Sequence, residues 1–112
     1  MKCLFCQFAA RKITTNLVFE DKEMIVFRDI NPQAPVHLLI CPKKHMDSVN
    51  ELKESDAKIV ARMIYQAKIL AKKFNLKDRG YRLVINTGKS AGQEIKHLHI
   101  HLLGGKQLGQ IA

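Results

Sequence analysis

Three histidines alternate with apolar residues near the end of the chain, in the run His97-Leu98-His99-Ile100-His101-Leu102-Leu103. Strict alternation of this kind predicts a β-strand with two different faces. Its leucine and isoleucine side chains then face a core, and the three imidazoles lie on the opposite face. Crowded or buried imidazoles cost free energy unless each has a partner. The histidine face therefore indicates a working site rather than simple packing.

The spacing of this row limits what the histidines can do together. A strand rises about 3.3 Å per residue, which places His97 and His101 roughly 13 Å apart along it. One metal ion can take two neighbours of the row but hardly all three. We therefore expect the three histidines to have separate roles.

The size of the chain predicts one domain over residues 1–112, since 46% hydrophobic content over this length suffices for a single core. No apolar run approaches the roughly 18 residues of a membrane span. The opening Met1-Lys2-Cys3-Leu4-Phe5-Cys6-Gln7 is too short for a secretory signal. We therefore expect a cytoplasmic protein that does not associate with a membrane.

The formal net charge is +9, from 19 Lys and Arg against 10 Asp and Glu. Such a surface attracts phosphate-bearing ligands. The lysines are dispersed, however, and two Tyr, five Phe and no Trp do not make a long stacking surface for single strands. We expect no specific nucleic-acid binding. The charge either steers small phosphorylated ligands or forms a solvated basic face.

Five β-prone runs are separated by turns and by one long helical pattern. The strands are expected at residues 17–20, 24–28, 36–41, 81–87 and 97–103. Residues Asp21-Lys22-Glu23 indicate a hairpin between the first two strands. A domain of this order is predicted to be α+β with an antiparallel sheet.

The long helix is indicated by apolar residues that recur every three or four positions from Ile59 to Phe74. Ser55 or Asp56 can cap its start. Ser48-x-x-Glu51 fits a capping box and predicts the beginning of a short helix.

Cysteines are few and odd in number, which argues against a disulfide framework. Cys41 is expected to be a small buried residue. Cys3-x-x-Cys6 supplies half of a zinc site, for which histidine is the usual complement. His97 can serve such a site while His99 stays free. Alternatively, Cys3 and Cys6 are reduced thiols at a loose terminus.

A glycine-containing loop over residues 88–94 ends just before the histidine run. Its glycines let backbone N–H groups approach a ligand closely, and such groups can form an anion-binding concavity. Alone, the loop is only a turn between two strands. Beside three histidines in a basic chain, it predicts a phosphate site.

Several segments of the sequence resemble those of a known family. The histidine run resembles the histidine-triad (HIT) motif, His-φ-His-φ-His-φ-φ with φ apolar. Other segments resemble further parts of the family in the same order, and together they cover nearly the whole chain: Cys3-Leu4-Phe5-Cys6, Phe27-Arg28-Asp29-Ile30 with Pro32-Gln33-Ala34-Pro35-Val36-His37, Pro42-Lys43-Lys44-His45 and Ala91-Gly92-Gln93-Glu94-Ile95. The similarity is closest to the Hint branch of purine nucleoside phosphoramidases and nucleotide-binding hydrolases, in its bacterial zinc-containing form.

The resemblance implies a HIT-like α+β fold, a five-stranded antiparallel sheet with one long and one short helix, and a homodimer. It implies that His99 is the nucleophile that attacks an α-phosphate, that His101 contacts the phosphate, and that His37 lines the site. Neutral imidazole suits this task near pH 7 because its ordinary pKa is about 6.5. A covalent intermediate would split one displacement into two steps.

The resemblance also assigns the parts of a purine nucleotide substrate. The phosphate would contact Asn86, Gly92 and the backbone of Glu94 and Ile95, and Asp29 would take the ribose hydroxyls. The purine would be enclosed by Leu4, Phe5, Phe8, Ile13 and Phe27. By analogy with zinc-containing relatives, a structural zinc would be held by Cys3, Cys6, His45 and His97. No metal is needed for the chemistry itself.

Two departures from animal Hint proteins limit the transfer. Glu94 stands where those proteins usually have serine, and the short end after Gly105 lacks their Trp-Pro-Pro tail. Two other classes of function stay open. One is a zinc hydrolase that uses His99 and His101 with a third ligand. The other is a nucleotide-binding or protein-interaction module whose turnover is incidental.

Overall fold

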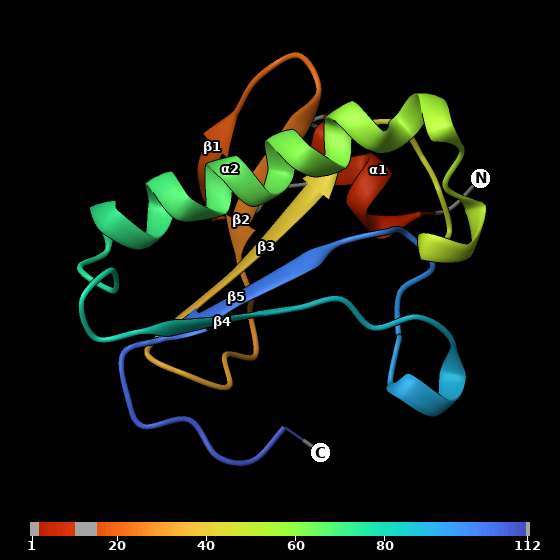
Figure 1. Cartoon of the computed structure of the whole chain (residues 1–112). Coiled ribbons are helices and arrows are strands. Elements are labelled where there is room, and N and C mark those ends of the chain that lie inside the picture. Colours follow the sequence, from red (N-terminus) through yellow and green to blue (C-terminus); the bar gives the residue numbers. More distant parts are fainter. Residues whose placement is uncertain (1–2, 11–15, 112) are drawn as a thin grey trace.

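The computed structural model describes residues 3–10 and 16–111. Its strands form one antiparallel five-stranded sheet in the order β1-β2-β3-β5-β4, so the expected α+β class is confirmed (Figure 1). The elements, in chain order, are α1 (Leu4–Ala9), β1 (Leu17–Glu20), β2 (Met24–Arg28), β3 (Val36–Pro42), α2 (Ala57–Lys73), β4 (Tyr81–Val84) and β5 (Ile100–Gly104). Short 3₁₀ turns lie at Val49–Glu51, Glu54–Asp56 and Lys89–Ala91.

The predicted hairpin joins β1 to β2. Asp21 fixes its turn, because one oxygen of its carboxylate accepts hydrogen bonds from the backbone N–H groups of Glu23 and Met24, at 2.8 and 2.9 Å. Both bonds favour the ionised carboxyl, and together with Arg62 they lower the pKa of Asp21 despite its partial burial. The register of β2 follows from this turn.

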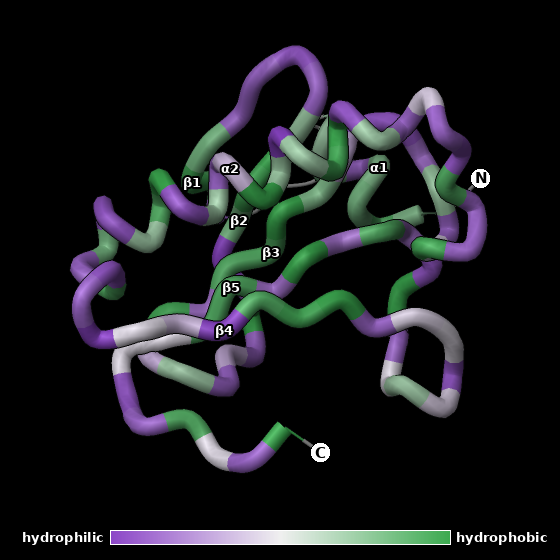
Figure 2. The backbone as a smooth tube through the Cα atoms, in the orientation of Figure 1, coloured by the Kyte–Doolittle hydropathy of each residue, from purple (hydrophilic) through white to green (hydrophobic). Residues whose placement is uncertain are grey.

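The first face of the sheet carries the core beneath α2. Met24, Val26, Leu38, Ile40 and Ile100 alternate along three neighbouring strands and are buried there. The helix contributes its own buried stripe, which consists of Met63, Ala67 and Leu70. In Figure 2 hydrophobic residues accordingly run through the central strands, while hydrophilic residues occupy the β1–β2 turn. The helical period read from the sequence is confirmed.

The opposite face of the sheet is covered only in part. Phe27, Leu39 and Cys41 point to this side and pack against Phe5 and Phe8 of α1. Cys41 is fully buried, as expected. Among the described residues, neither α1 nor α2 covers the remainder of this face, on which His37 and His101 alternate with core leucines.

Two strand boundaries next to the histidine run differ from the sequence prediction, and so does the position of the short helix. β4 ends at Val84 rather than at residue 87, and β5 begins at Ile100 rather than at His97. Leu98 leaves the ladder because its N–H donates to the Met46 carbonyl instead, at 2.7 Å. The short α-helix is α1, whereas the capping box near Ser48 begins only a 3₁₀ turn.

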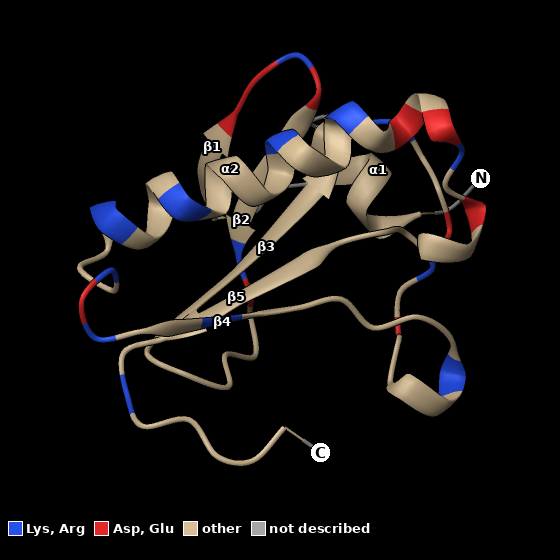
Figure 3. Cartoon of the chain, in the orientation of Figure 1, with Lys and Arg blue, Asp and Glu red and all other residues tan. Residues whose placement is uncertain are grey.

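Charge is spread unevenly over the elements (Figure 3). Acidic residues gather in the 3₁₀ turn before α2. Lys72 and Lys73 occupy the last turn of α2, where positive charge suits the helix dipole. Asp56 starts this helix, and Lys44 and the Lys53 N–H lower the pKa of its carboxyl. Within residues 3–10 and 16–111 no helix is both long and apolar enough to cross a membrane.

Candidate functional site

The three histidines of the row occupy three different environments, as the spacing predicts. His97 joins Cys3, Cys6 and His45 in one group of potential metal ligands. His101 joins Asp29 and His37 in a second group. His99 lies between them and, among the described residues, belongs to neither group. The zinc-hydrolase hypothesis, which needs His99 and His101 on one metal, therefore lacks its ligand set in this structure.

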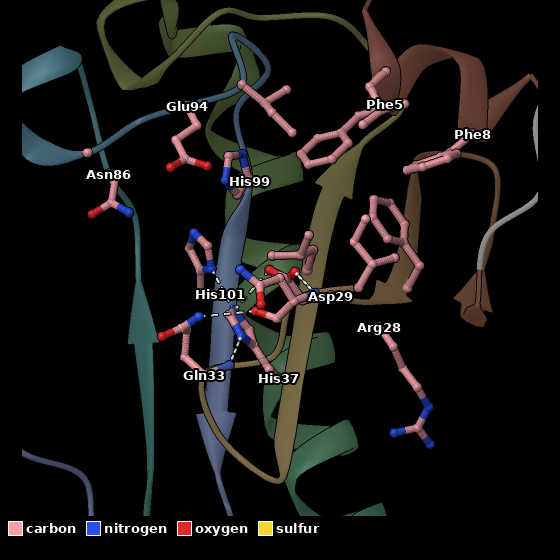
Figure 4. A pocket seen from close by; sticks show the side chains of 17 residues that line it. Phe5, Phe8, Arg28, Asp29, Gln33, His37, Asn86, Glu94, His99 and His101 are labelled. Carbon is pink, nitrogen blue, oxygen red and sulfur yellow. Dashed lines mark hydrogen bonds and ion pairs between the residues drawn. The ribbon is translucent and has the colours of Figure 1, made fainter.

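A cavity of about 460 Å³ opens on the uncovered face of the sheet (Figure 4). This volume suits a drug-sized ligand. Twelve residues singled out in the sequence line it: Leu4, Phe5, Phe8, Phe27, Asp29, His37, Asn86, Gly92, Glu94, Ile95, His99 and His101. Ile13, also expected to enclose the purine, lies outside the described residues. Residues far apart in the sequence thus meet around one cavity.

One end of the cavity is aromatic. The rings of Phe5 and Phe27 lie 5.2 Å apart edge to face, and those of Phe8 and Phe27 lie 4.8 Å apart. The centroid of the Phe5 ring also lies 5.0 Å from that of the His99 imidazole, and the two rings are nearly perpendicular. Such edge-to-face contacts fix ring orientation. The same cluster therefore gives this end of the cavity an apolar lining and holds the imidazole beside it.

His99 has a defined tautomer. Its Nδ1 lies 2.6 Å from the His97 carbonyl oxygen, which can only accept, so Nδ1 carries the proton. The lone pair of the neutral ring is then on Nε2. Burial lowers the pKa of His99, an effect that outweighs this hydrogen bond and the nearby Asp29 carboxylate. At pH 7 the side chain is a neutral imidazole with a free nitrogen, which is the form that can act as a nucleophile.

His37 and His101 form a directed relay. The Gln33 N–H donates to Nδ1 of His37 at 3.0 Å, so the neutral ring of His37 is protonated on Nε2. That nitrogen lies 2.9 Å from Nδ1 of His101 and 3.4 Å from an Asp29 carboxylate oxygen. His101 therefore accepts on Nδ1 and keeps its own proton on Nε2, as a donor to a ligand.

Both rings of the relay are held neutral. Burial lowers the pKa of His37, and burial with the neighbouring His99 and His37 lowers the pKa of His101 to about 4. A neutral relay can donate a hydrogen bond without placing a fixed positive charge in the cavity.

The loop over residues 86–95 borders the polar end of the cavity. We call it the phosphate loop after the role that the sequence predicts for it. Gly88 and Gly92 have φ values of 85° and 84°, a region that favours glycine, and a Cβ at Gly92 would meet no atom within 4 Å. Among the described residues, the backbone N–H groups of Glu94 and Ile95 have no hydrogen-bond partner. Both residues line the cavity. Open backbone donors of this kind suit an anion.

The second cluster brings Cys3, Cys6, His45 and His97 together. Nδ1 of His97 lies 3.2 Å from Sγ of Cys3, Nδ1 of His45 lies 3.4 Å from Sγ of Cys6, and the two Nδ1 atoms lie 3.1 Å apart. Tetrahedral zinc with two thiolates and two imidazoles separates neighbouring ligand atoms by about 3.3–3.8 Å. The three separations lie at the lower end of this range or slightly below it, so the four ligand atoms can share one tetrahedral ion after a small outward adjustment.

The proton positions support the same assignment. Nε2 of His97 donates to the Pro42 carbonyl, and Nε2 of His45 donates to an Asp47 carboxylate oxygen, both at 2.7 Å. With Nε2 used in these hydrogen bonds, Nδ1 of each ring points inward and is the nitrogen that can bind a metal, as in metal-binding histidines. Burial and the adjacent Cys3 raise the pKa of the Cys6 thiol to about 11, so a thiolate here needs a bound cation.

The Asp29, His37 and His101 group fails the same test. A metal at Nε2 of His37 would shift the ring proton to Nδ1, where it would face the Gln33 N–H donor at 3.0 Å.

Sequence reasoning did not single out Gln33 or Leu39 for the cavity, although both line it. Leu39 could have been found, because it lies two residues from His37 on one strand and shares its face.

These features can be set beside known proteins. The HIT domain model matches residues 10–108, and the chain belongs to the HIT family. A HIT family hydrolase from Legionella pneumophila shares 47% identity, covers 98% of each chain and has a TM-score of 0.96. A 14 kDa zinc-binding protein from Zea mays is 42% identical over 94% of this chain and 83% of its own.

The fold extends to a nucleotide-binding relative. A histidine triad nucleotide-binding protein from Candida albicans has a TM-score of 0.82 and 25% identity, and covers 99% of this chain and 86% of its own. The family resemblance read from the sequence is thereby confirmed.

Proposed function

We propose that the protein hydrolyses purine nucleoside 5′-phosphoramidates or closely related nucleotides through a nucleotidyl-His99 intermediate. The observation that carries this proposal is the tautomer of His99, whose Nε2 is free while Nδ1 donates to the His97 carbonyl. A hydrolase-type activity also agrees with the Legionella relative, which is described as a HIT family hydrolase.

The polarity of the cavity supports a nucleotide as substrate. The purine would lie in the aromatic slot made by Phe5, Phe8 and Phe27. Asp29 would accept hydrogen bonds from the ribose hydroxyls. The phosphate would reach Asn86 and the open N–H groups of the phosphate loop, beside His99. The description of the Candida relative as nucleotide-binding agrees with this orientation.

The chemistry would proceed in two displacements. Nε2 of His99 forms a bond to the α-phosphorus while the P–N bond to the leaving amine breaks, and the departing nitrogen takes up one proton from solvent at the open side of the cavity. Nε2–H of His101 and the loop donors hold the phosphoryl oxygens, in a partly enclosed site where such bonds act strongly. Water then attacks the same phosphorus and gives up one proton to solvent, the bond between Nε2 of His99 and phosphorus breaks, and the nucleoside monophosphate leaves with neutral His99 restored.

Hydrolysis of adenosine 5′-phosphoramidate tests the proposal. Chromatography should detect AMP released in amounts far above the enzyme concentration. AMP that binds tightly without any turnover would instead support the nucleotide-binding module and contradict the enzyme. A reaction that survives exhaustive chelation is also expected, because the reacting nitrogen belongs to His99.

We also propose that Cys3, Cys6, His45 and His97 hold one structural zinc ion, with a supporting parallel in the zinc-binding relative from Zea mays. When bound, zinc would supply a tetrahedral cross-link and no reacting group. Cys3 and Cys6 at α1 would thereby be tied to His45 and His97. Reduced thiols are required for this role, which agrees with a cytoplasmic location.

A homodimer is the third part of the proposal. α2 buries one stripe on the sheet, yet its outer side carries Ile64, Tyr65 and Ile69, with 47, 61 and 43% of their surfaces exposed. β4 is an edge strand, and Tyr81 at its start is also exposed. Large exposed apolar residues near an open edge suit contact with a second copy.

A further inference from the structure

Gln93 occupies a junction that neither the sequence prediction nor the proposed mechanism uses. It is half-buried in the phosphate loop but does not line the cavity. Its side-chain amide makes three hydrogen bonds. Oε1 accepts from the Gly88 N–H at 2.9 Å, and Nε2 donates to the carbonyls of Asp47 and Ile95, at 2.6 and 3.0 Å.

The first of these bonds closes the loop on itself. The Gln93 backbone N–H donates to the Gly88 carbonyl at 3.1 Å, while the Gln93 side chain accepts from the Gly88 N–H. The two residues are thereby paired in both directions across the 3₁₀ turn between them. This pairing fixes the place where the chain turns back toward the cavity.

The second bond joins the closed loop to a different part of the chain. Asp47 follows His45, whose Nε2 donates to the Asp47 carboxylate, and the adjacent Met46 carbonyl accepts from the Leu98 N–H. The segment over residues 45–47 is therefore fixed to Leu98, which lies between His97 and His99. Gln93 therefore ties the phosphate loop to residues 45–47, which are in turn bonded to Leu98 beside His99.

The third bond reaches the residues that face the ligand. The bond from the Gln93 side chain to the Ile95 carbonyl closes a ring around the two peptide groups that flank Glu94, whose N–H donors have no partner among the described residues. We infer that Gln93 is a positioning residue that holds these donors at the distance a phosphoryl group requires from His99. The inference rests on the proposed function for the identity of the ligand.

Three variants separate this role from general stability. Gln93→Met keeps the length and packing of the side chain but removes all three bonds. Gln93→Glu keeps the acceptor for the Gly88 N–H and loses both donors. Gln107→Ala is the control, because the only hydrogen bond that this exposed amide makes within the described part of the chain is to the neighbouring Leu108 carbonyl. Calorimetry measures the Kd of AMP and of adenosine for each, and steady-state rates give kcat and KM.

The expected result is selective for phosphate. Gln93→Met and Gln93→Glu should weaken AMP binding about tenfold, which corresponds to about 1.4 kcal/mol, and leave adenosine within about twofold. KM should rise and kcat should fall, while Gln107→Ala matches wild type. AMP binding unchanged in both variants, or AMP and adenosine weakened alike, would overturn the inference.

A measurement without nucleotide keeps the two proposals distinguishable. In the free wild-type protein the Gly88 amide should be protected from hydrogen exchange, and Gln93→Met should remove that protection while amides of β3 stay protected. If wild-type protein binds no AMP, the proposed function fails, and the Gly88 amide alone then decides whether Gln93 closes the loop. Protection that is unchanged in Gln93→Met would overturn the inference.

Discussion

Two features of its surroundings, a hydrogen bond and burial, suit the His99 imidazole to the proposed role of nucleophile, although they shift its pKa in opposite directions. The His97 carbonyl fixes the proton on Nδ1, and burial among aromatic rings disfavours the charged form. The first effect orients the lone pair, and the second keeps it available. His101 is treated similarly, although its proton faces the ligand because His37 donates to its other nitrogen. Two histidines of one row thereby acquire opposite roles.

The pH profile follows from these shifts. The pKa of His99 lies below its ordinary value of about 6.5, and the pKa of His101 is lowered to about 4. Each group must be neutral for the reaction, so activity is lost only when pH falls through the lowered values. We expect kcat/KM, which reports the free enzyme, to stay level from pH 8 to 6.5 and to decline at lower pH.

Rates from pH 4 to 8, corrected for uncatalysed hydrolysis of the phosphoramidate, measure this profile. A decline already complete at pH 6.5 would contradict the assigned neutral state.

At the level of elements, β5 depends on close contact with the turn after α2. A Cβ added at Gly104 would lie 2.8 Å from a Leu76 methyl carbon, and Leu76 is buried. We expect Gly104→Ala to lower the free energy of unfolding by about 1–3 kcal/mol, as overpacked cores do. Urea titration measures the loss. Gly109→Ala is the matched control, because nothing lies within 4 Å of its added carbon.

Leu76→Ala introduced together with Gly104→Ala should cost less than the sum of the two single changes, since the smaller side chain removes the clash. Strict additivity would show that the contact is not the cause.

The position of α1 is expected to depend on the metal cluster. Cys3 caps this six-residue helix, with Sγ accepting from the Cys6 N–H, and helices this short need external support. Cys3→Ser should release bound zinc and lower the thermal midpoint by several degrees. A bound ion whose free concentration is 100 times its Kd contributes about 2.7 kcal/mol to stability, and this contribution would be lost. Some phosphoramidate hydrolysis should remain.

Metal analysis and thermal unfolding of the purified variant measure both effects. Cys41→Ala is the control, because Cys41 is buried outside the four-residue cluster, and it should retain its zinc. Wild-type protein that is metal-free and gains no stability from added zinc would contradict the structural role.

Most elements could be predicted from periodicity, but α1 could not. Leu4–Ala9 is too short to show a helical repeat, and its Phe5 and Phe8 are held by Phe27 on a distant strand. The early end of β4 and late start of β5 have a similar cause. Where His97 turns toward Pro42 and the cysteines, tertiary contacts replace the ladder that alternation predicts.

The candidate site shows the same division. Residues carried on motifs, such as His99 and Gly92, could be singled out from the sequence. Gln33 and Gln93 could not, because each acts through one backbone or side-chain amide whose partner is set by the fold.

The whole molecule presents an apolar outer side of α2 that a second copy would cover. We expect light scattering at micromolar concentration to give about twice the 12.8 kDa chain mass. Ile69→Asp should shift the mass toward one chain, because it places a charge in the contact. Lys58→Asp adds the same acid to the same helix without removing an apolar side chain, and it should stay dimeric. A stable wild-type monomer would contradict the dimer.

On the proposed function, the two sites of the molecule would divide its work, with one cluster holding the N-terminal helix in place and the other carrying the chemistry. The central claim is that His99 forms the covalent bond to the nucleotide. His99→Ala should therefore lose turnover by about 10³-fold or more. It should still bind AMP, since the proposed ribose and purine contacts lie on other residues.

The most direct test is to quench the wild-type reaction with adenosine 5′-phosphoramidate early and to map the adduct by mass spectrometry. We predict a nucleotidyl group on the peptide that contains His99, at the imidazole of that residue, and no adduct in His99→Ala. An adduct on another residue, or His99→Ala protein that hydrolyses the substrate at nearly the wild-type rate, would contradict the account.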